Sequence, residues 1–203
     1  KSAPPTADRW AAIEVLGLRG DREAIPVLRT LGMAKDRFIA ESAALALARL
    51  GEVDGLEMLR GFLESSKDED RRLFLAARLA NLGDPLGYSF VAKAAADPIV
   101  ERRFLSVAAL VAFLPHEAAS RGAIDAERRL LALASDESKK VRYEFVIQAS
   151  LAVERGGNRG RFVAALRSLA AADDDPEVQE MARLMVSGLE GLDVEDQEKV
   201  EKH

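Results

Sequence analysis

Hydrophobic residues recur along the chain at the spacing of helices that bury one face. The clearest examples are two stripes whose members lie three and four residues apart: Phe104, Val107, Ala108 and Val111, then Val141, Phe145, Ala149 and Val153. Because an α-helix has about 3.6 residues per turn, each stripe falls on one side of a helix. The longest uninterrupted apolar run, residues 107–114, is far shorter than the roughly 17 residues that a helix needs to cross a bilayer. The pattern predicts amphipathic helices packed against one another, without membrane insertion.

Glycine or proline interrupts this helical pattern at a nearly fixed interval. The breaks fall at Gly20, Gly51, Gly83, Pro115 and Gly156. Successive breaks are 31, 32, 32 and 41 residues apart, so we expect an insertion in the fourth unit, between residues 116 and 127. A fixed period of about 20 to 50 residues is typical of proteins whose repeated units stack side by side.

Each unit is predicted to contain a first helix, a break, a second helix and a turn. Paired alanines in the first helices, such as Ala43-Ala44, allow a neighbouring helix to approach closely. The second helices begin just after the breaks, where Asp84-Pro85 combines a capping aspartate with proline at the first helical position. The pattern therefore predicts stacked helix pairs.

Three segments carry a family resemblance: GDREAIPVL at residues 20–28, LGDP at residues 82–85 and DPEV at residues 175–178. They resemble the short bacterial HEAT-like repeats, a type first named from the phycobilin lyases. The resemblance covers residues 7–189 and implies an all-α solenoid, a superhelix of about five helix-turn-helix repeats, with a terminal half-repeat at residues 177–189. It also implies that the first helices form the convex side and that the second helices line the concave side.

The two ends of the chain differ in composition from the repeats. The opening KSAPPT is rich in proline, and the last residues are mostly charged with little to bury. We therefore expect a linker at residues 1–6, the HEAT-like solenoid at residues 7–190 and a charged C-terminal tail at residues 191–203. Because the first residue is lysine, we expect an upstream segment, and the localisation stays open between a soluble cytoplasmic protein and one exported after that segment is removed.

Composition narrows the chemistry that the chain can perform. Hydrophobic residues make up 48% of the chain and aromatic residues only 5%, which favours helices packed through small side chains over a sheet sandwich. The chain contains no cysteine, which excludes disulfides, thiolate metal sites and cysteine nucleophiles. A net charge of −5 is unlike that of a general polyanion binder.

Candidate catalytic and metal-binding groups are few. His116-Glu117 is the internal histidine-carboxylate pair, and the other histidine is His203. HEAT-like deoxyhypusine hydroxylases hold iron with several such pairs, so the resemblance implies that one pair is too few for a ligand set. Acidic runs at residues 68–70 and 173–175 lack the glycine spacing of a calcium loop, and we interpret them as helix caps and turns. We therefore expect no metal, no cofactor and no catalysis.

Alignment of the predicted second helices places a basic residue at or near the same position of each unit. These residues are Arg29, Arg60, Lys93, Arg128 and Arg167. If the second helices are concave, the five side chains form a basic row inside an acidic protein. Arginine can hold a carboxylate or a phosphate through two parallel hydrogen bonds. The alternative interpretation is that these are ordinary solvated charges, since arginine is common throughout the chain.

Three functions fit these features. The one we favour is a non-catalytic protein–protein interaction scaffold or adaptor, whose concave face binds an acidic or extended segment of a protein partner. One alternative is nucleic-acid binding through the same basic row. The other is a lyase-like or assembly helper for a cofactor-bearing client, which the phycobilin-lyase resemblance implies.

The predicted half-repeat bears on the oligomeric state. Its apolar candidates have no second helix of their own to cover them: Val178, Met181, Leu184 and Met185. Either residues 189–200 fold back over this face and the protein is a monomer, or two chains meet there as a weak dimer.

Overall fold

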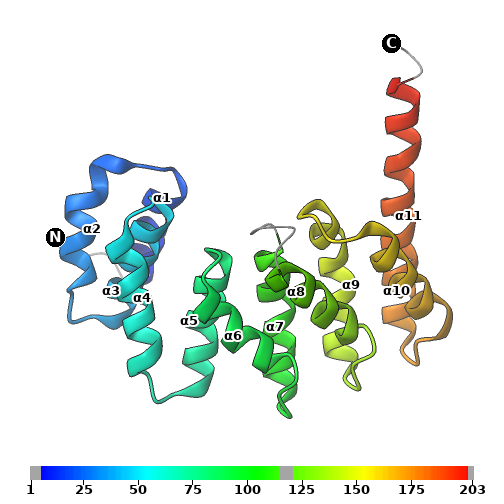
Figure 1. Ribbon diagram of the computed structural model, residues 1–203, viewed down its shortest axis with the longest axis horizontal. Coiled ribbons are helices and arrows are strands. Elements are labelled where there is room, and N and C mark those ends of the chain that lie inside the picture. The colour runs from blue at the N-terminus through cyan, green and yellow to red at the C-terminus, as the bar shows by residue number, and fades with distance from the viewer. Residues whose placement is uncertain (1–5, 115–120, 201–203) are drawn as a thin grey trace. The chain divides into compact units, whose positions relative to one another are not determined.

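The computed structural model describes residues 6–114 and 121–200, with side chains for residues 9–114 and 122–191 (Figure 1). This part of the chain contains eleven α-helices, one 3-10 helix and no strand. The first helices of the repeats are α1 (Thr6–Leu18), α3 (Arg37–Arg49), α5 (Glu69–Asn81), α7 (Val100–Phe113), α9 (Lys139–Glu154) and α11 (Pro176–Val200). The second helices are α2 (Ile25–Gly32), α4 (Val53–Ser65), α6 (Pro85–Ala94), α8 (Arg121–Leu133) and α10 (Arg159–Ala172), and η1 (Arg22–Ala24) leads into α2. The order confirms the predicted all-α solenoid of repeats.

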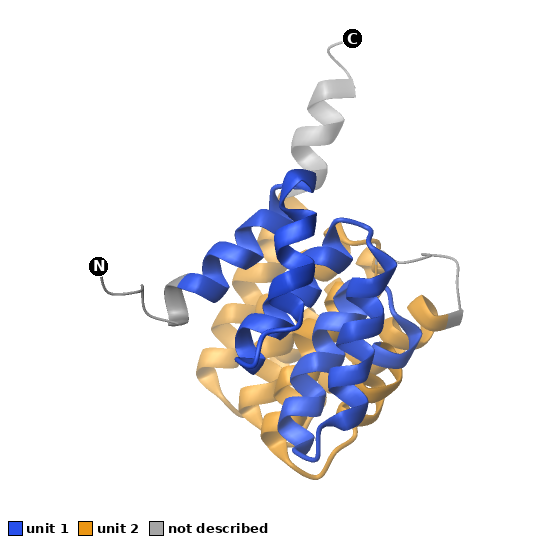
Figure 2. Ribbon diagram, turned by 90° about the vertical axis from the view of Figure 1, so that its left-hand side faces the viewer, with its two compact units in different colours: residues 1–87 blue, residues 88–203 orange. Residues whose placement is uncertain are grey.

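The chain divides into two compact units, residues 1–87 and residues 88–203, which Figure 2 colours separately. The boundary falls inside α6, so unit 1 holds α1 to α5 and the start of α6. Unit 2 holds the rest of α6 and α7 to α11. The domain boundaries expected from the sequence, with one solenoid over residues 7–190, stay a prediction. The predicted pair His116-Glu117 lies outside the described residues, as does His203.

The four glycine breaks end their first helices with one shared geometry. Gly20, Gly51, Gly83 and Gly156 have φ angles of 71°, 83°, 76° and 98°. Glycine adopts this left-handed conformation without a steric penalty, and it is typical of the residue just beyond a helix C-terminus. The backbone N–H after each glycine donates to a carbonyl of the last helical turn; at Gly20, for example, Asp21 donates to Leu16 over 3.1 Å. The glycines predicted as breaks are confirmed as helix ends.

Aspartates in the turns cap the helices that follow. Asp68 Oδ1 accepts hydrogen bonds from the backbone N–H groups of Asp70 and Arg71 at 3.0 and 3.2 Å. Asp175 Oδ1 accepts from the backbone N–H of Glu177 at 3.0 Å. Each bond satisfies an N–H group that has no partner within the helix. The interpretation of the two acidic runs as caps and turns is confirmed.

The core of unit 1 is centred on α3. Its residues 39–48 are all buried, and six of these ten are alanine or serine side chains. Gly17 of α1 approaches α3 so closely that a Cβ there would lie 2.6 Å from Ala46 Cα. Gly55 of α4 is closer still, because a Cβ there would lie 2.4 Å from the backbone nitrogen of Ala48. Small side chains at these crossings are what allow the helices of unit 1 to stack.

The core of unit 2 is built from larger side chains. Phe145 of α9 and Phe162 of α10 are fully buried and stack with ring centroids 5.9 Å apart. Fully or almost fully buried aliphatic residues from α7, α8 and α10 surround this core: Val107, Leu110, Leu130 and Leu166. Of one predicted stripe, Val141, Phe145 and Ala149 are buried in unit 2 and Val153 is half-buried. Of the other, Val107 and Val111 are buried, whereas Ala108 is exposed, so its prediction as part of the buried face is wrong.

The last helix is longer and better covered than expected. The sequence predicted a helix at residues 177–189 followed by a tail, whereas α11 runs without a break from Pro176 to Val200. Val178 is buried and Met181 and Met185 are half-buried against unit 2, so of the four apolar candidates only Leu184 is largely exposed, at 55%. The expected uncovered face is therefore wrong for Val178, because α11 packs against both α9 and α10. A continuous α11 is also at odds with a fold-back of residues 189–200.

Candidate interaction face

All five residues of the predicted basic row are exposed and lie on second helices. In unit 1, Arg29 lies on α2 and Arg60 on α4. In unit 2, Lys93 lies on α6, Arg128 on α8 and Arg167 on α10. Their role in binding stays a prediction. The carboxylates next to each basic side chain decide how much of its positive charge remains to attract a ligand.

Arg29 is held by two carboxylates at the start of α4. Its Nη2 donates to Glu52 Oε2 at 2.6 Å, and its Nε donates to Asp54 Oδ2 at 2.7 Å. The hydrogen bond and charge of Asp54 raise the pKa of Arg29, and the hydrogen bond from Arg29 lowers the pKa of Asp54. Arg22 Nη2 also lies 3.3 Å from Glu52 Oε1. Two guanidinium groups thus balance two carboxylates here.

Arg60 neutralises a carboxylate that caps the next second helix. Its Nε and Nη2 both donate to Asp84 Oδ2, at 2.8 and 2.5 Å. The other oxygen of the nearly fully buried Asp84 accepts from the backbone N–H groups of Leu86 and Gly87 at 2.9 and 3.2 Å. Arg60 therefore stabilises the start of α6 and contributes no excess positive charge.

Arg128 in unit 2 shares one carboxylate with two other donors. Asp125 accepts from Arg128 through Oδ1, and from Tyr88 Oη at 2.5 Å and Arg129 Nε at 2.6 Å through Oδ2. The Tyr88 ring stacks on Phe113 with centroids 4.3 Å apart. Burial and the hydrogen bond to Asp125 raise the pKa of Tyr88 to about 12. Burial by itself would raise the pKa of Asp125, but hydrogen bonds from Tyr88, Arg129 and Arg128 outweigh it and lower that pKa.

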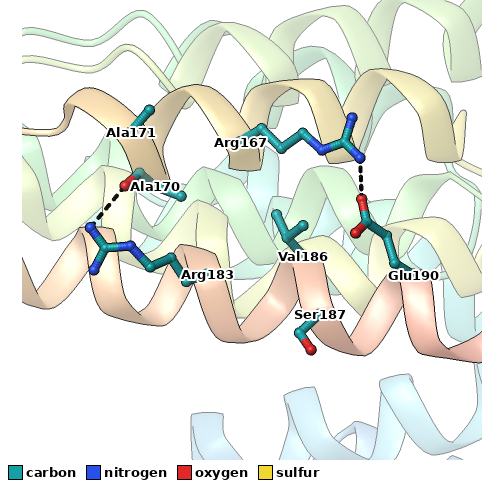
Figure 3. Close-up of a pocket in the computed structure, with 7 residues that line it drawn as sticks. All are labelled: Arg167, Ala170, Ala171, Arg183, Val186, Ser187 and Glu190. Atoms are coloured by element: carbon teal, nitrogen blue, oxygen red, sulfur yellow. Dashed lines mark hydrogen bonds and ion pairs between the residues drawn. The ribbon is translucent and has the colours of Figure 1, made fainter.

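Arg167 lines a surface pocket between α10 and α11. The pocket has a volume of about 360 Å³, and Figure 3 shows the Arg167 and Arg183 guanidinium groups at its two ends with Val186 between them. Arg167 Nη2 donates to Glu190 Oε1 at 2.5 Å, and Arg183 Nη2 donates to the Ala170 carbonyl at 3.1 Å. Both contacts hold α11 against α10.

Lys93 differs from the four arginines of the row. Its side chain makes no hydrogen bond or ion pair with any residue for which the structure describes a side chain. The backbone N–H of Ile99 is the main cause that lowers the pKa of Asp97, and the positive charge of Lys93 lowers it to a smaller extent. Lys93 is thus an exposed charge that forms no ion pair with a carboxylate among the described side chains.

Unit 2 also contains a regular pairing of charges that sequence reasoning missed. Arg103 of α7 donates to both carboxylate oxygens of Asp136, at 2.7 and 3.1 Å, and Arg142 of α9 repeats this with Asp173 at 2.7 and 2.9 Å. These hydrogen bonds raise the pKa of each arginine and are the main cause that lowers the pKa of Asp173. An aspartate six residues before an arginine, at residues 97–103 and again at residues 136–142, is the signal that could have revealed the pattern.

Two absences apply to the part of the chain that the structure describes. Within residues 6–114 and 121–200, no helix is both long and apolar enough to span a membrane. Among the side chains that the structure describes, those of residues 9–114 and 122–191, no three or more aspartate or glutamate side chains are grouped so that they could hold a metal ion.

Stacked helix pairs with left-handed glycines at the ends of the first helices define a helical repeat protein. The family model for HEAT repeats matches residues 1–80, so this part of the chain is similar to HEAT repeats. A designed armadillo repeat protein is similar in structure, with 19% identity, a TM-score of 0.47 and coverage of 93% of this chain and 96% of that one. A second engineered protein is similar at 18% identity and a TM-score of 0.45, with coverage of 94% and 93%. No protein of curated function matches the sequence significantly.

Proposed function

We propose that the protein is a non-catalytic interaction scaffold that binds an extended segment of a protein partner on its second-helix face, the face that the resemblance predicts to be concave. Repeat folds of this kind commonly mediate protein interactions, because stacked helices offer long surfaces in place of deep pockets. The observation that carries the proposal is the set of donors left open on unit 2. Lys93 forms no ion pair with a carboxylate whose side chain the structure describes, and Arg128 and Arg167 have side chains that are 74% and 65% exposed.

Arg128 and Arg167 each keep N–H groups that are not used in their internal ion pairs. A guanidinium group has five N–H donors. Arg128 directs one of its nitrogens to Asp125, and Arg167 directs one to Glu190. The remaining N–H groups of both side chains can bind backbone carbonyls or carboxylates of a partner without breaking the internal pairs.

Charge balance favours a protein partner over nucleic acid. In unit 1 both arginines of the row are matched by internal carboxylates, Arg29 by Glu52 and Asp54 and Arg60 by Asp84. Nucleic-acid binding relies on excess positive charge that neutralises several phosphates. The row lacks that excess in unit 1, and in unit 2 Lys93 and the Arg128–Arg129 pair on Asp125 supply too few charges for a run of phosphates. Its exposed N–H groups still suit the separate carboxylates and carbonyls of a peptide.

Site-specific photocrosslinking tests this proposal. A photoreactive amino acid replaces Lys93 on the second-helix face, and in a matched control it replaces the exposed Ala108 on first helix α7. We expect a protein from the native host's extract to be crosslinked through position 93 and not through position 108. Adding Arg128→Gln and Arg167→Gln to the position 93 variant should abolish that crosslink, with an unchanged circular dichroism spectrum as the control for folding. Equal crosslinking at both positions, or a crosslink that survives the two substitutions, would contradict the proposal.

A further inference from the structure

The first helices of unit 1 bring together three charged side chains that do not belong to the basic row. Glu14 of α1 forms an ion pair with Arg78 of α5, with Arg78 Nη2 2.7 Å from Glu14 Oε1. Arg49, the last residue of α3, interacts electrostatically with both Glu14 and Arg78. Two guanidinium groups therefore share one carboxylate, and the cluster carries one excess positive charge.

Arg49 is the member of this cluster that a ligand can reach. It is exposed and makes no hydrogen bond or ion pair with a residue that the structure describes. Partial burial is the largest influence on its pKa and lowers it, the charge of Glu14 opposes this, and the charge of Arg78 adds to the lowering. The positive charge on Arg49 is thus incompletely compensated within the chain. A further carboxylate from outside would compensate it.

Large apolar side chains surround the cluster on the same helices. Trp10 and Leu18 lie four residues before and after Glu14, which places all three on one side of α1. Phe74 lies one turn before Arg78 on α5, and the Arg78 guanidinium sits 4.6 Å from the centre of its ring. Trp10, Leu18 and Phe74 are 39%, 68% and 49% exposed. We call the four residues Trp10, Leu18, Arg49 and Phe74 the first-helix patch.

We propose that the first-helix patch docks a peptide segment of a partner protein in which acidic and apolar residues alternate, with a carboxylate bound to Arg49 and an apolar side chain packed on Phe74. Charge complementarity identifies the acidic residue, since the cluster is positive while the chain as a whole has a net charge of −5. The exposed aromatic side chains of the patch identify the apolar neighbours, because aromatic side chains anchor protein interfaces. Nucleic acid fits less well, because one excess charge cannot neutralise a run of phosphates. This site is independent of the second-helix face proposed above.

Trp10 provides the measurement, because it is the one tryptophan of the chain and belongs to the patch. A short synthetic peptide of alternating glutamate and leucine is titrated into the full chain while Trp10 fluorescence is recorded. Matched peptides carry glutamine in place of glutamate, or serine in place of leucine, and inorganic phosphate is titrated as a separate arm. We expect saturable binding of the glutamate–leucine peptide, binding about tenfold weaker for either matched peptide, and no effect of phosphate at the same concentrations.

Three variants connect the signal to the patch. Arg49→Gln and Phe74→Ser should each weaken binding of the glutamate–leucine peptide by about tenfold. Because Arg49 is exposed and its charge is poorly compensated, Arg49→Gln is expected to fold as the wild type does, which circular dichroism checks. Arg29→Gln on the second-helix face of the same unit is the control and should bind like the wild type. Loss of binding in Arg29→Gln alone would place the peptide on the second-helix face and overturn this proposal while supporting the other.

Two further results would overturn the docking proposal. One is an absence of binding at millimolar peptide, and the other is unchanged binding by both Arg49→Gln and Phe74→Ser. An equal fluorescence response to phosphate and to the peptide would also overturn it, because the patch would then bind anions without recognising a peptide.

Discussion

Arg142→Met removes the guanidinium group that joins α9 to the turn before α11. The side chain is 10% exposed, and its partner Asp173 is 2% exposed. Besides its two bonds to Asp173, Arg142 donates through Nη1 to the carbonyls of Asp136 and Glu137 at 2.9 and 3.2 Å, and it pairs with Asp174. Methionine keeps the unbranched shape of the side chain and its helix propensity, so the substitution isolates the loss of these polar contacts.

The expected cost follows from what the substitution leaves behind. Removing one partner of a buried ion pair leaves a charge without compensation and costs about 3 to 5 kcal/mol. Asp173 keeps one donor, the backbone N–H of Asp175 at 2.9 Å, and the second carboxylate, Asp174, is 87% exposed and returns to water. We therefore expect the free energy of unfolding to fall by about 3 kcal/mol, at the lower end of that range.

Chemical denaturation followed by far-ultraviolet circular dichroism measures this loss. Arg161→Met is the matched control, because Arg161 is 66% exposed and pairs with Glu127 at 3.0 Å. Its partner Glu127 is 13% exposed but keeps the backbone N–H of Asn158 as a donor at 2.9 Å, so removing the solvated Arg161 guanidinium should cost only about 1 kcal/mol. Since Trp10 lies in unit 1, the Arg142 variant should move the circular dichroism transition more than the tryptophan fluorescence transition. Equal shifts for the Arg142 and Arg161 variants would refute the view that the buried pairing stabilises unit 2.

Three other predictions follow from particular contacts. A Cβ at Gly61 would meet open space, so Gly61→Ala should stabilise α4 by up to about 1 kcal/mol. In the same helix, Gly55→Ala should cost about 1 to 3 kcal/mol, because its Cβ would lie 2.4 Å from the Ala48 backbone. Thermal denaturation of the two variants measures the difference. The pKa of Asp173 is lowered below its usual 3.8, so its stabilising effect is present above pH 3.8 and lost as the pH falls through the folded-state pKa. The stability difference between the wild type and Asp173→Asn should therefore shrink below pH 3.8. The Tyr88 hydroxyl should lose its proton with a pKa of about 12 in a spectrophotometric titration, and Tyr88→Phe should remove that tyrosinate absorbance. If the absorbance that Tyr88→Phe removes instead appears at a lower pH, the hydrogen bond to Asp125 does not raise the pKa of Tyr88.

The repeat fold could be predicted because its signals are local. A left-handed residue at a helix end needs glycine, so Gly20, Gly51 and Gly83 mark those ends in the sequence itself. The length of α11 was underestimated for a related reason. Charged residues after Leu189 were interpreted as a solvated tail, yet no proline follows to stop the helix, and α11 continues to Val200.

The candidate site was predictable only in part, because ion pairing depends on which repeats meet. The sequence placed Arg29 and Arg60 on second helices, and the structure has them there. Their partners Asp54 and Asp84 are about 24 residues away, and only the stacking of one repeat on the next brings them within hydrogen-bond distance. A row of arginines in sequence is therefore a row of neutralised pairs in unit 1.

Charge that is already matched within the fold is a poor guide to where partners bind. Arg60 and Arg142 each hold a carboxylate that is at most 2% exposed, and a partner that took over either arginine would leave that carboxylate buried without compensation. Lys93 and Arg49 hold no buried carboxylate among the described residues, so an external acidic group could bind either side chain without breaking such a pair. In a chain this rich in arginine, the residues that recognise partners should be sought among the cations that the repeats leave unmatched.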